Sequence, residues 1–352
     1  MLRGPVARTI GGAPLFNEAA IAAQGPANSL DFYWQAEGQT TWHAHRIAGR
    51  GSDYGAPSGA QLGEETTVAV PGPRHSLDYY WAVEGSTRWH RETVAGANSI
   101  YSAPWLAHIG DSMAIVAQGR DHSLDYYWQA DGKTTWHRET VTGRDSSYSA
   151  PSMTEFNGKL TDVAAQGSAG RLDVYEQVIG SRSWHSERVA GKGSTASAPS
   201  VAAIGTAVTV AAEGPRGRLD YYWQQLNTTR WHPELVAGQH STDSPPSLLQ
   251  IQNSSVITAE GHGGSLAYYW QTIGQAKWNP ERSAGAGTSY SAPSLASVVA
   301  GGSFASGVAV QARKHGLDFY WQGIGLVPWH LQRVAGKNTT YSAPSMFPVN
   351  LV

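Results

Sequence analysis

A unit of about 47 residues recurs seven times along this chain of 352 residues and constrains its fold more than any other feature. Each copy carries Leu-Asp-Tyr-Tyr-Trp or a variant of it, then a second Trp, a Val-Ala-Gly-like turn and a Ser-Ala-Pro-like turn. A period of this length is typical of propellers and solenoids, in which all copies form one body. We therefore expect residues 1–352 to form one domain, although the length alone suggests roughly two or three. The copies are anchored, at intervals of 47, 47, 48, 47, 47 and 51 residues, on Leu30, Leu77, Leu124, Leu172, Leu219, Leu266 and Leu317.

The fourth copy shows how one unit is expected to fold. Its strand-forming segments are residues 153–156, 160–166, 172–178 and 183–189, and turn residues such as Asn157-Gly158 separate them. Enrichment in Trp, Tyr, Val and Thr favours strands over helices. Four short antiparallel strands with a repeated Gly and aromatic signature are typical of a propeller blade. The sequence thus predicts an all-β, seven-bladed β-propeller with four antiparallel strands in each blade.

The two ends of the chain are predicted to share one blade. The first copy is shorter than the others before its anchor, which leaves barely enough residues for an innermost strand. Residues 342–352 open an eighth unit and then stop. We expect this C-terminal strand to pair into the N-terminal blade, whose other strands come from residues 15–48, and so to close the ring. The long interval of 51 residues is assigned to an inserted loop around residues 300–303.

The third copy allows a prediction of strand register. If the turn centres on Gly132, Trp128 pairs with Trp136 and Tyr127 pairs with His137. Side chains alternate between the two faces of a strand, so this register decides which residues share a face. It places Leu124, Tyr126, Trp128, Trp136 and Arg138 on one face, and Asp125, Tyr127, His137 and Glu139 on the other. Both faces are aromatic, as expected for blades that pack face to face.

Charge and composition exclude several classes of function. The net charge is −2 and the pI about 6.7, so nothing is built to neutralise a nucleic-acid backbone. The chain has no cysteine, and therefore no disulfide and no thiolate metal site. Neither a signal peptide nor a membrane span is visible, which indicates a soluble protein, in the cytoplasm, exported by a non-classical route or already trimmed. The charge and composition are also compatible with a homo-oligomer.

The aromatic and polar residues around the second Trp are the candidate binding site. Sugars are held by aromatic surfaces that stack on C–H faces and by Arg, His, Glu or Asp that pair with hydroxyls, and repetition adds avidity. The competing interpretation is blade packing, which we favour for Trp128 and its equivalents. The predicted ligand-binding residues are Trp89, His90, Arg91, Glu92, Tyr101, Trp136, His137, Arg138, Glu139, Tyr148, Trp184, His185, Trp231 and His232.

No catalytic, cofactor or metal site is expected. The histidines recur once per blade and would not converge on one ion. The repeated Asp is more easily interpreted as a ladder partner than as one of the paired carboxylates of a glycosidase. No nucleophile elbow or phosphate-binding loop is present. A protein-interaction scaffold is the first alternative function, and a glycosidase or lyase in the central funnel is the second.

The unit resembles those of tectonin and sialidase-like propeller lectins, on its Ser-Ala-Pro-Ser opening, its Gly170–Tyr175 strand and its Trp-rich last strand. In layout it is most similar to bacterial fucose-binding seven-bladed propeller lectins. The resemblance covers nearly the whole chain and implies sugar sites in clefts between neighbouring blades. These would lie among the Trp-His-Arg-Glu strands and the Tyr-Ser-Ala-Pro turns. The Tyr-Tyr-Trp strand and the Val-Ala-Gly turn depart from that family, so the identity of the sugar does not carry over.

Overall fold

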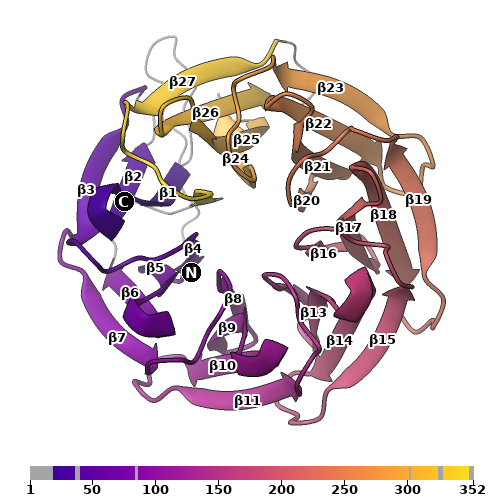
Figure 1. Cartoon of the computed structure of the whole chain (residues 1–352), viewed down its shortest axis with the longest axis horizontal. Coiled ribbons are helices and arrows are strands. Elements are labelled where there is room, and N and C mark those ends of the chain that lie inside the picture. The colour runs from indigo at the N-terminus through magenta and orange to yellow at the C-terminus, as the bar shows by residue number, and fades with distance from the viewer. Residues whose placement is uncertain (1–18, 36–39, 84–85, 301–302, 324–327, 349–352) are drawn as a thin grey trace, which may run out of the picture.

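The chain forms a ring of seven four-stranded antiparallel sheets arranged as blades around a central axis (Figure 1). The structure is a computed structural model and describes residues 19–35, 40–83, 86–300, 303–323 and 328–348. The all-β, seven-bladed propeller predicted from the repeat is confirmed. No helix within the described ranges is long and apolar enough to cross a membrane.

Each blade runs from an innermost strand beside the axis to an outermost strand at the rim. The innermost strands are β28 (Ser345–Pro348), β4 (Ser58–Leu62), β8 (Trp105–Ile109), β12 (Ser152–Phe156), β16 (Ser200–Ile204), β20 (Ser247–Ile251) and β24 (Ser294–Ala300). The second strands are β1 (Ala19–Gln24), β5 (Glu65–Pro71), β9 (Ser112–Gln118), β13 (Leu160–Gln166), β17 (Ala207–Gly214), β21 (Ser254–Gly261) and β25 (Ser303–Ala312).

The two outer strands of each blade carry the repeated aromatic motifs. The third strands are β2 (Leu30–Gln35), β6 (Leu77–Val83), β10 (Leu124–Ala130), β14 (Leu172–Val178), β18 (Arg218–Gln225), β22 (Ser265–Thr272) and β26 (Gly316–Gly323). The outermost strands are β3 (His43–Ala48), β7 (His90–Ala95), β11 (His137–Thr142), β15 (His185–Ala190), β19 (His232–Ala237), β23 (Asn279–Ala284) and β27 (His330–Ala335). Single 3-10 turns join the second and third strands of four blades at η1 (Pro26–Asn28), η2 (Pro73–His75), η3 (Arg120–His122) and η4 (Ser168–Gly170).

The structure places the strands of the fourth copy close to where the sequence predicts them. β13 and β14 match their predicted bounds, and β12 and β15 differ from theirs by one or two residues at an end. The tight turns at Asn157-Gly158 and Gly180 use positive φ angles, as turn residues of these types allow. Local turn chemistry and alternation of residue types are therefore enough to place the elements of a blade.

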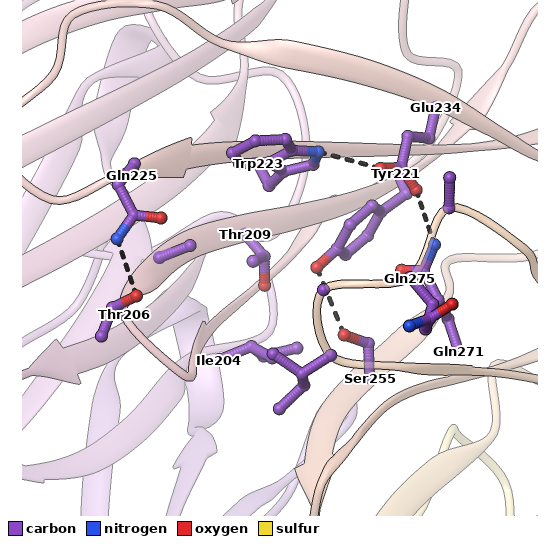
Figure 2. Close-up of a pocket in the computed structure, with 14 residues that line it drawn as sticks. Ile204, Thr206, Thr209, Tyr221, Trp223, Gln225, Glu234, Ser255, Gln271 and Gln275 are labelled. Atoms are coloured by element: carbon purple, nitrogen blue, oxygen red, sulfur yellow. Dashed lines mark hydrogen bonds between the residues drawn. The ribbon is translucent and has the colours of Figure 1, made fainter.

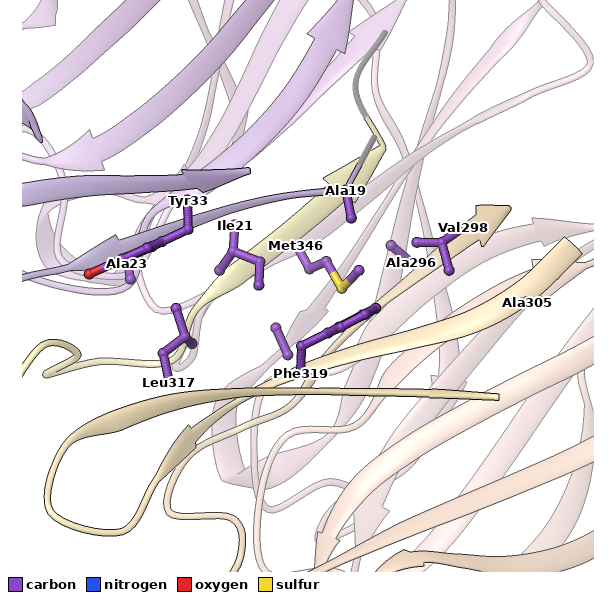
Figure 3. Packing of buried hydrophobic residues seen from close by; sticks show 11 residues of the cluster. Ala19, Ile21, Ala23, Tyr33, Ala296, Val298, Ala305, Leu317, Phe319 and Met346 are labelled. Carbon is purple, nitrogen blue, oxygen red and sulfur yellow. The ribbon is translucent and has the colours of Figure 1, made fainter. Parts of the chain in front are cut away.

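The C-terminal strand closes the ring, as predicted. β28 pairs antiparallel with β1, in a register that sets Met346 opposite Ile21 and Phe347 opposite Ala20. Met346 packs with Ile21, Phe319 and other residues of the first and last blades (Figure 3). Residues 15–18 and 349–352 of the predicted shared blade lie outside the described part of the chain. The inserted residues lengthen the β24–β25 hairpin, while the predicted loop residues 301 and 302 are outside that part as well.

A serine at the start of most inner strands links neighbouring blades around the axis. Its hydroxyl oxygen accepts a hydrogen bond from a backbone N–H of the next inner strand, at 2.8–3.2 Å. These links explain the repeated Ser-Ala-Pro-Ser motif. Trp105 takes the serine's place in the third blade. The linking serines are Ser58, Ser152, Ser200, Ser247, Ser294 and Ser345.

The predicted register between the third and outermost strands is wrong by one residue. Trp128 pairs with His137, and not with Trp136, while Tyr126 pairs with Glu139 and Tyr127 with Arg138. The reason is that residues 133–136 run outside the ladder after the turn, because Trp136 leaves it to pack on the preceding blade. A further register shift follows at Leu124 and Asp125, and the same shift recurs in the other blades.

This correction exchanges the faces predicted for the outermost strand. His137 and Glu139 share a face with Trp128, whereas Arg138 lies with Asp125 and Tyr127. Tyr126 packs towards the following blade and Tyr127 towards the preceding one, so neither face of the blade is left to solvent. Seven buried clusters, each shared by two adjacent blades, form the core of the ring.

Candidate functional site

Two pockets of the same design lie between adjacent blades. One, with a volume of about 350 Å³, lies between the third and fourth blades. The other, of about 360 Å³, lies between the fifth and sixth blades. Volumes of this order are at the small end of the range for ligand pockets. Because the same residue types line both, the pocket is a property of the repeat.

The third strand of one blade supplies the aromatic wall of each pocket. In the third blade Tyr126 and Trp128 alternate along β10 and therefore face the fourth blade together. His137, which is opposite Trp128 in the ladder, stacks on its indole at a ring distance of 4.4 Å. In the fifth blade the same wall is formed by Tyr221 and Trp223 (Figure 2).

The following blade supplies an apolar and polar wall. Gln177, Ile179 and Thr161 complete the pocket between the third and fourth blades. Their equivalents between the fifth and sixth blades are Gln271, Ile273 and Ser255. The pocket therefore combines a flat aromatic surface, an aliphatic side chain, an amide and a hydroxyl group.

A glutamate from the outermost strand joins the two walls. The Glu139 Oε1 atom accepts the indole N–H of Trp128 at 3.1 Å, and Oε2 accepts the amide N–H of Gln177 across the interface at 3.0 Å. Glu234 does the same with Trp223 at 2.9 Å and Gln271 at 3.0 Å (Figure 2). A carboxylate has about four lone-pair sites, so each of these glutamates keeps acceptor capacity for a ligand hydroxyl.

Tyrosine hydroxyl groups on the pocket wall remain donors at neutral pH. Burial raises the pKa of Tyr221 to about 12, with hydrogen bonds from Ser255 and Thr209 opposing the shift. Its hydroxyl lies 3.4 Å from the Ser255 Oγ atom. Burial also raises the pKa of Tyr126, and the nearby charge of Glu139 adds to the increase.

The predicted residue Trp136 packs between blades. Its indole N–H donates to the Glu92 Oε2 atom of the preceding blade at 2.9 Å, and its ring packs edge-on against Tyr79 at 5.1 Å. Trp231 donates in the same way to Glu187 at 3.1 Å. The second Trp of each unit is therefore a contact to the preceding blade.

Other predicted tryptophans occupy the same interfacial position. Trp89 packs edge-on against Phe32 at 5.3 Å, and Trp184 packs against Tyr126 at 5.3 Å. The indole nitrogen of Trp184 is buried and has no hydrogen-bond partner among the described residues. These contacts agree with a packing role for the second Trp.

The predicted histidines and arginines lie on different faces of the outermost strand. His90, His137 and His232 each stack on the Trp of their own third strand, with ring distances of 4.1–4.4 Å. His185 has Glu176 in that position and lies 3.7 Å from a carboxylate oxygen of Glu187. Arg91 and Arg138 turn to the other face and pair at 3.0 Å with the repeated aspartates Asp78 and Asp125.

The predicted Tyr101 and Tyr148 lie at the opposite end of the blades from the Trp-His segments. Each is exposed in the connection between blades and stacks on a histidine of the turn between a second and a third strand, His75 or His122. The structure thus does not bring these tyrosines together with Trp136 and its equivalents. Of the residues predicted from the sequence, Glu139 is the one that lines either described pocket.

The residues that sequence reasoning missed are the third-strand aromatics and the glutamine that follows them. The sequence alone favours a packing role for Trp128 and Trp223 and indicates no role for Gln177 and Gln271. The sequence contains the signal, because Gln directly follows the aromatic motif in most copies and Glu is the fourth residue of the Trp-His-x-Glu motif. What was missing was the register that brings the Glu and the Trp to the same face.

Several solved structures that are similar to this chain are lectins, and one of them is described as a six-bladed β-propeller. The BP39L lectin from Burkholderia pseudomallei superimposes with a TM-score of 0.80 and 18% identity, over 92% of this chain and 96% of that one. AofleA from Arthrobotrys oligospora gives a TM-score of 0.60 and 12% identity, over 95% and 93%. A mutant of Aleuria aurantia lectin in complex with α-methyl-L-fucoside gives 0.57 and 14%, over 82% and 96%.

At these identities the likeness shows a shared fold. It bears out the predicted resemblance to propeller lectins, while the tectonin part of that resemblance stays a prediction. No family model and no curated protein matches the chain.

Proposed function

We propose that the protein is a carbohydrate-binding lectin with several similar sites between neighbouring blades and no catalytic role. The observation that carries the proposal is the recurrence of one pocket, with Trp, Tyr, Glu, Gln and Ile in matching positions, at two interfaces. Aromatic faces suit the C–H surfaces of a sugar, and the fixed carboxylate and amide suit its hydroxyls. Two or more weak sites on one rigid ring gain avidity on multivalent glycans.

The ligand class we propose is a neutral monosaccharide unit, with fucose as the first candidate. The Aleuria aurantia lectin that shares the fold was solved with a fucoside. Each pocket holds one inter-blade glutamate, and both of its oxygens already accept hydrogen bonds from the protein. The pocket between the third and fourth blades is also lined by Asp111 and Arg182, whose charges offset each other. Such a glutamate favours a hydroxylated ligand over an anion, because a second negative charge would be repelled.

Sequence variation between blades predicts which interfaces bind. Both described pockets pair a Trp on one blade with an Ile on the next. At the interface of the fourth and fifth blades, Glu176 stands where that Trp should be. At the interface of the second and third blades, Asp131 stands where Ile179 and Ile273 stand in the pockets. We expect weaker binding or none at these two interfaces.

The test is calorimetric titration with methyl α-L-fucoside, supported by a glycan array. The Trp128→Ala/Trp223→Ala double variant should lose about two sites per chain, or most of the heat, with an unchanged circular dichroism spectrum. Trp81→Ala is the matched control, because it removes the same side chain beside Asp131 and should leave the stoichiometry unchanged. Equal binding by the double variant and the wild type would refute the location of the sites.

Other outcomes of these experiments distinguish the alternative functions. Silence on the array, together with a protein captured by the ring, would favour an interaction scaffold. Turnover of a chromogenic glycoside that a single carboxylate substitution abolishes would establish an enzyme. Inhibition of array binding by a free monosaccharide is the result that we expect.

A further inference from the structure

Six of the seven blades bury an aspartate at the second position of the repeated motif and pair it with an arginine. These Asp residues are 0–7% exposed. In the third blade, for example, Arg138 donates to both carboxylate oxygens of Asp125 at 3.0 Å. The ion pairs join Asp31 with Arg46, Asp78 with Arg91, Asp125 with Arg138, Asp173 with Arg171, Asp220 with Arg218, and Asp318 with Arg333.

Each of these carboxylates fills a small recess in its blade, which we call the notch. A Cβ atom on Gly119, before the turn into β10, would lie 2.0 Å from the Oδ2 atom of Asp125. The glycine thus leaves the space that the carboxylate occupies. The same closeness recurs at Gly25, Gly72, Gly167 and Gly214, whereas the seventh blade carries Asp318 with Ala312 in place of the glycine.

The sixth blade keeps the notch and the arginine but lacks the carboxylate. Ala267 stands at the aspartate position, and Arg282 lies opposite it in the ladder, as Arg46 lies opposite Asp31 in the first blade. Beside Gly261 the nearest atoms are the Ser265 Oγ at 2.7 Å, a backbone oxygen and the Ala267 Cβ at 3.6 Å. Among the described residues Arg282 is exposed and has no ion pair.

The vacated notch opens into a pocket of about 390 Å³. It is lined by the cationic Arg282, by His240 and His262, and by the hydroxyl-bearing side chains of Ser241, Ser265 and Tyr269. The pocket lies at the N-terminal end of β22, whereas the sugar pocket described above, with Ile273 and Gln275 in its lining, lies at the C-terminal end. The two sites are therefore distinct.

Charge in the pocket favours an anion. Of the described residues that line it, Glu281 is the acidic one, and each of its oxygens accepts an indole N–H from the sixth or seventh blade. Glu260 precedes Gly261, and burial with the nearby charge of Asp243 raises its pKa to about 7, which reduces its negative charge at neutral pH. Burial keeps the Tyr269 hydroxyl protonated by raising its pKa.

We propose that this pocket of the sixth blade binds the carboxylate of a small acidic ligand, such as a uronic acid, with Arg282 as its cationic partner. The ligand carboxylate would take the place that an aspartate side chain takes in the other six blades. A guanidinium presents paired N–H donors that match a carboxylate, and such charge-assisted hydrogen bonds are about twice as strong as neutral ones. The ring would then carry an anion site in addition to its neutral-sugar pockets.

The test compares methyl β-D-glucuronide with methyl β-D-glucoside, which differ at the carboxylate, by calorimetric titration or ligand-observed NMR. The glucuronide should bind the full-length protein at least about tenfold more tightly. The Ala267→Asp variant restores the built-in carboxylate and should abolish this preference. It should also melt at the same or a higher temperature, because Gly261 and Ser265 already fit an aspartate there.

Two further variants keep the proposal falsifiable. Arg282→Gln changes an exposed side chain and should also abolish the preference, so it decides the matter if Ala267→Asp fails to fold. Arg313→Gln, an exposed arginine in the seventh blade, is the control for general loss of positive charge and should bind as the wild type does. Equal affinity for the two glycosides, or a preference unaffected by Arg282→Gln, would overturn the proposal. Binding of methyl α-L-fucoside, measured alongside, reports separately on the sugar pockets.

Discussion

Replacing Asp162 with alanine should stabilise the protein by an amount that grows with pH. Asp162 lies on β13, is 1% exposed, and its Oδ2 atom has no hydrogen-bond partner among the described residues. Its ladder partner Glu176 is a second carboxylate, where other blades have a Trp. Burial raises the pKa of Asp162 to about 8, and the charges of Glu176 and Glu187 add to the increase.

The magnitude follows from the difference in pKa between the folded and unfolded states. Below about pH 4 the carboxyl is protonated in both states, and Asp162 causes no pH dependence. As the pH rises towards 8 the unfolded chain releases this proton and the folded chain retains it, so the free energy of unfolding falls. With about 1.4 kcal/mol for each tenfold difference in proton affinity, the wild type loses up to about 5 kcal/mol across this range. Alanine removes the loss, and it fits, since Ala114 occupies the equivalent position in the third blade and is fully buried.

The assay is urea unfolding followed by Trp fluorescence at about pH 5, 6.5 and 8. The stability gained by Asp162→Ala should be small at the lowest pH and reach several kcal/mol at the highest. Asp111→Asn, which changes an exposed carboxylate in the turn between β8 and β9, should leave the pH profile of the wild type unaltered. If the difference between Asp162→Ala and the wild type were the same at every pH, the carboxyl would be ionised in the folded state and the reasoning would fail.

The remaining predictions concern closure of the ring and packing between blades. Deleting residues 345–352 removes β28 and should lower the melting temperature by well over ten degrees; a melt like that of the wild type would contradict closure by β28. Trp136→Ala should cost about 2–4 kcal/mol in urea unfolding, because it removes the ring from the blade interface and leaves an oxygen of Glu92 without its indole donor; a loss below about 0.5 kcal/mol would speak against packing. Ser152→Ala should lower the free energy of unfolding by about 1–2 kcal/mol, because a buried backbone N–H of the next inner strand loses its acceptor. That N–H should also exchange faster with deuterium, and unchanged exchange would exclude the link.

The repeat made the fold predictable because each copy reports the same structure independently. A single turn such as Asn157-Gly158 is compatible with many folds. Seven copies of the unit at similar spacing leave few alternatives to a ring of blades. Closure by residues 345–348 could be inferred for the same reason, since the first copy lacked what the C-terminus supplied. These conclusions needed only local turn chemistry and the count of strands.

The proposed binding site was less predictable because it depends on register. The choice between Trp136 and His137 as the partner of Trp128 is a shift of one residue, and it moves Glu139 from one face of the blade to the other. The shift is set by tertiary packing, since Trp136 leaves the ladder for the preceding blade. A pattern within one copy cannot contain that information, because the partner lies in another.

The glutamate that joins adjacent blades would link stability to the proposed binding. Between the fifth and sixth blades, Glu234 accepts N–H groups from Trp223, Gln271 and Trp278, which come from two blades. These bonds fix the carboxylate before any ligand arrives, so little ordering cost is left for binding. The first blade has His45 at this position and the seventh has Gln332. We therefore expect the interfaces that keep the carboxylate to hold the ring most firmly, and we expect the binding sites to lie among them.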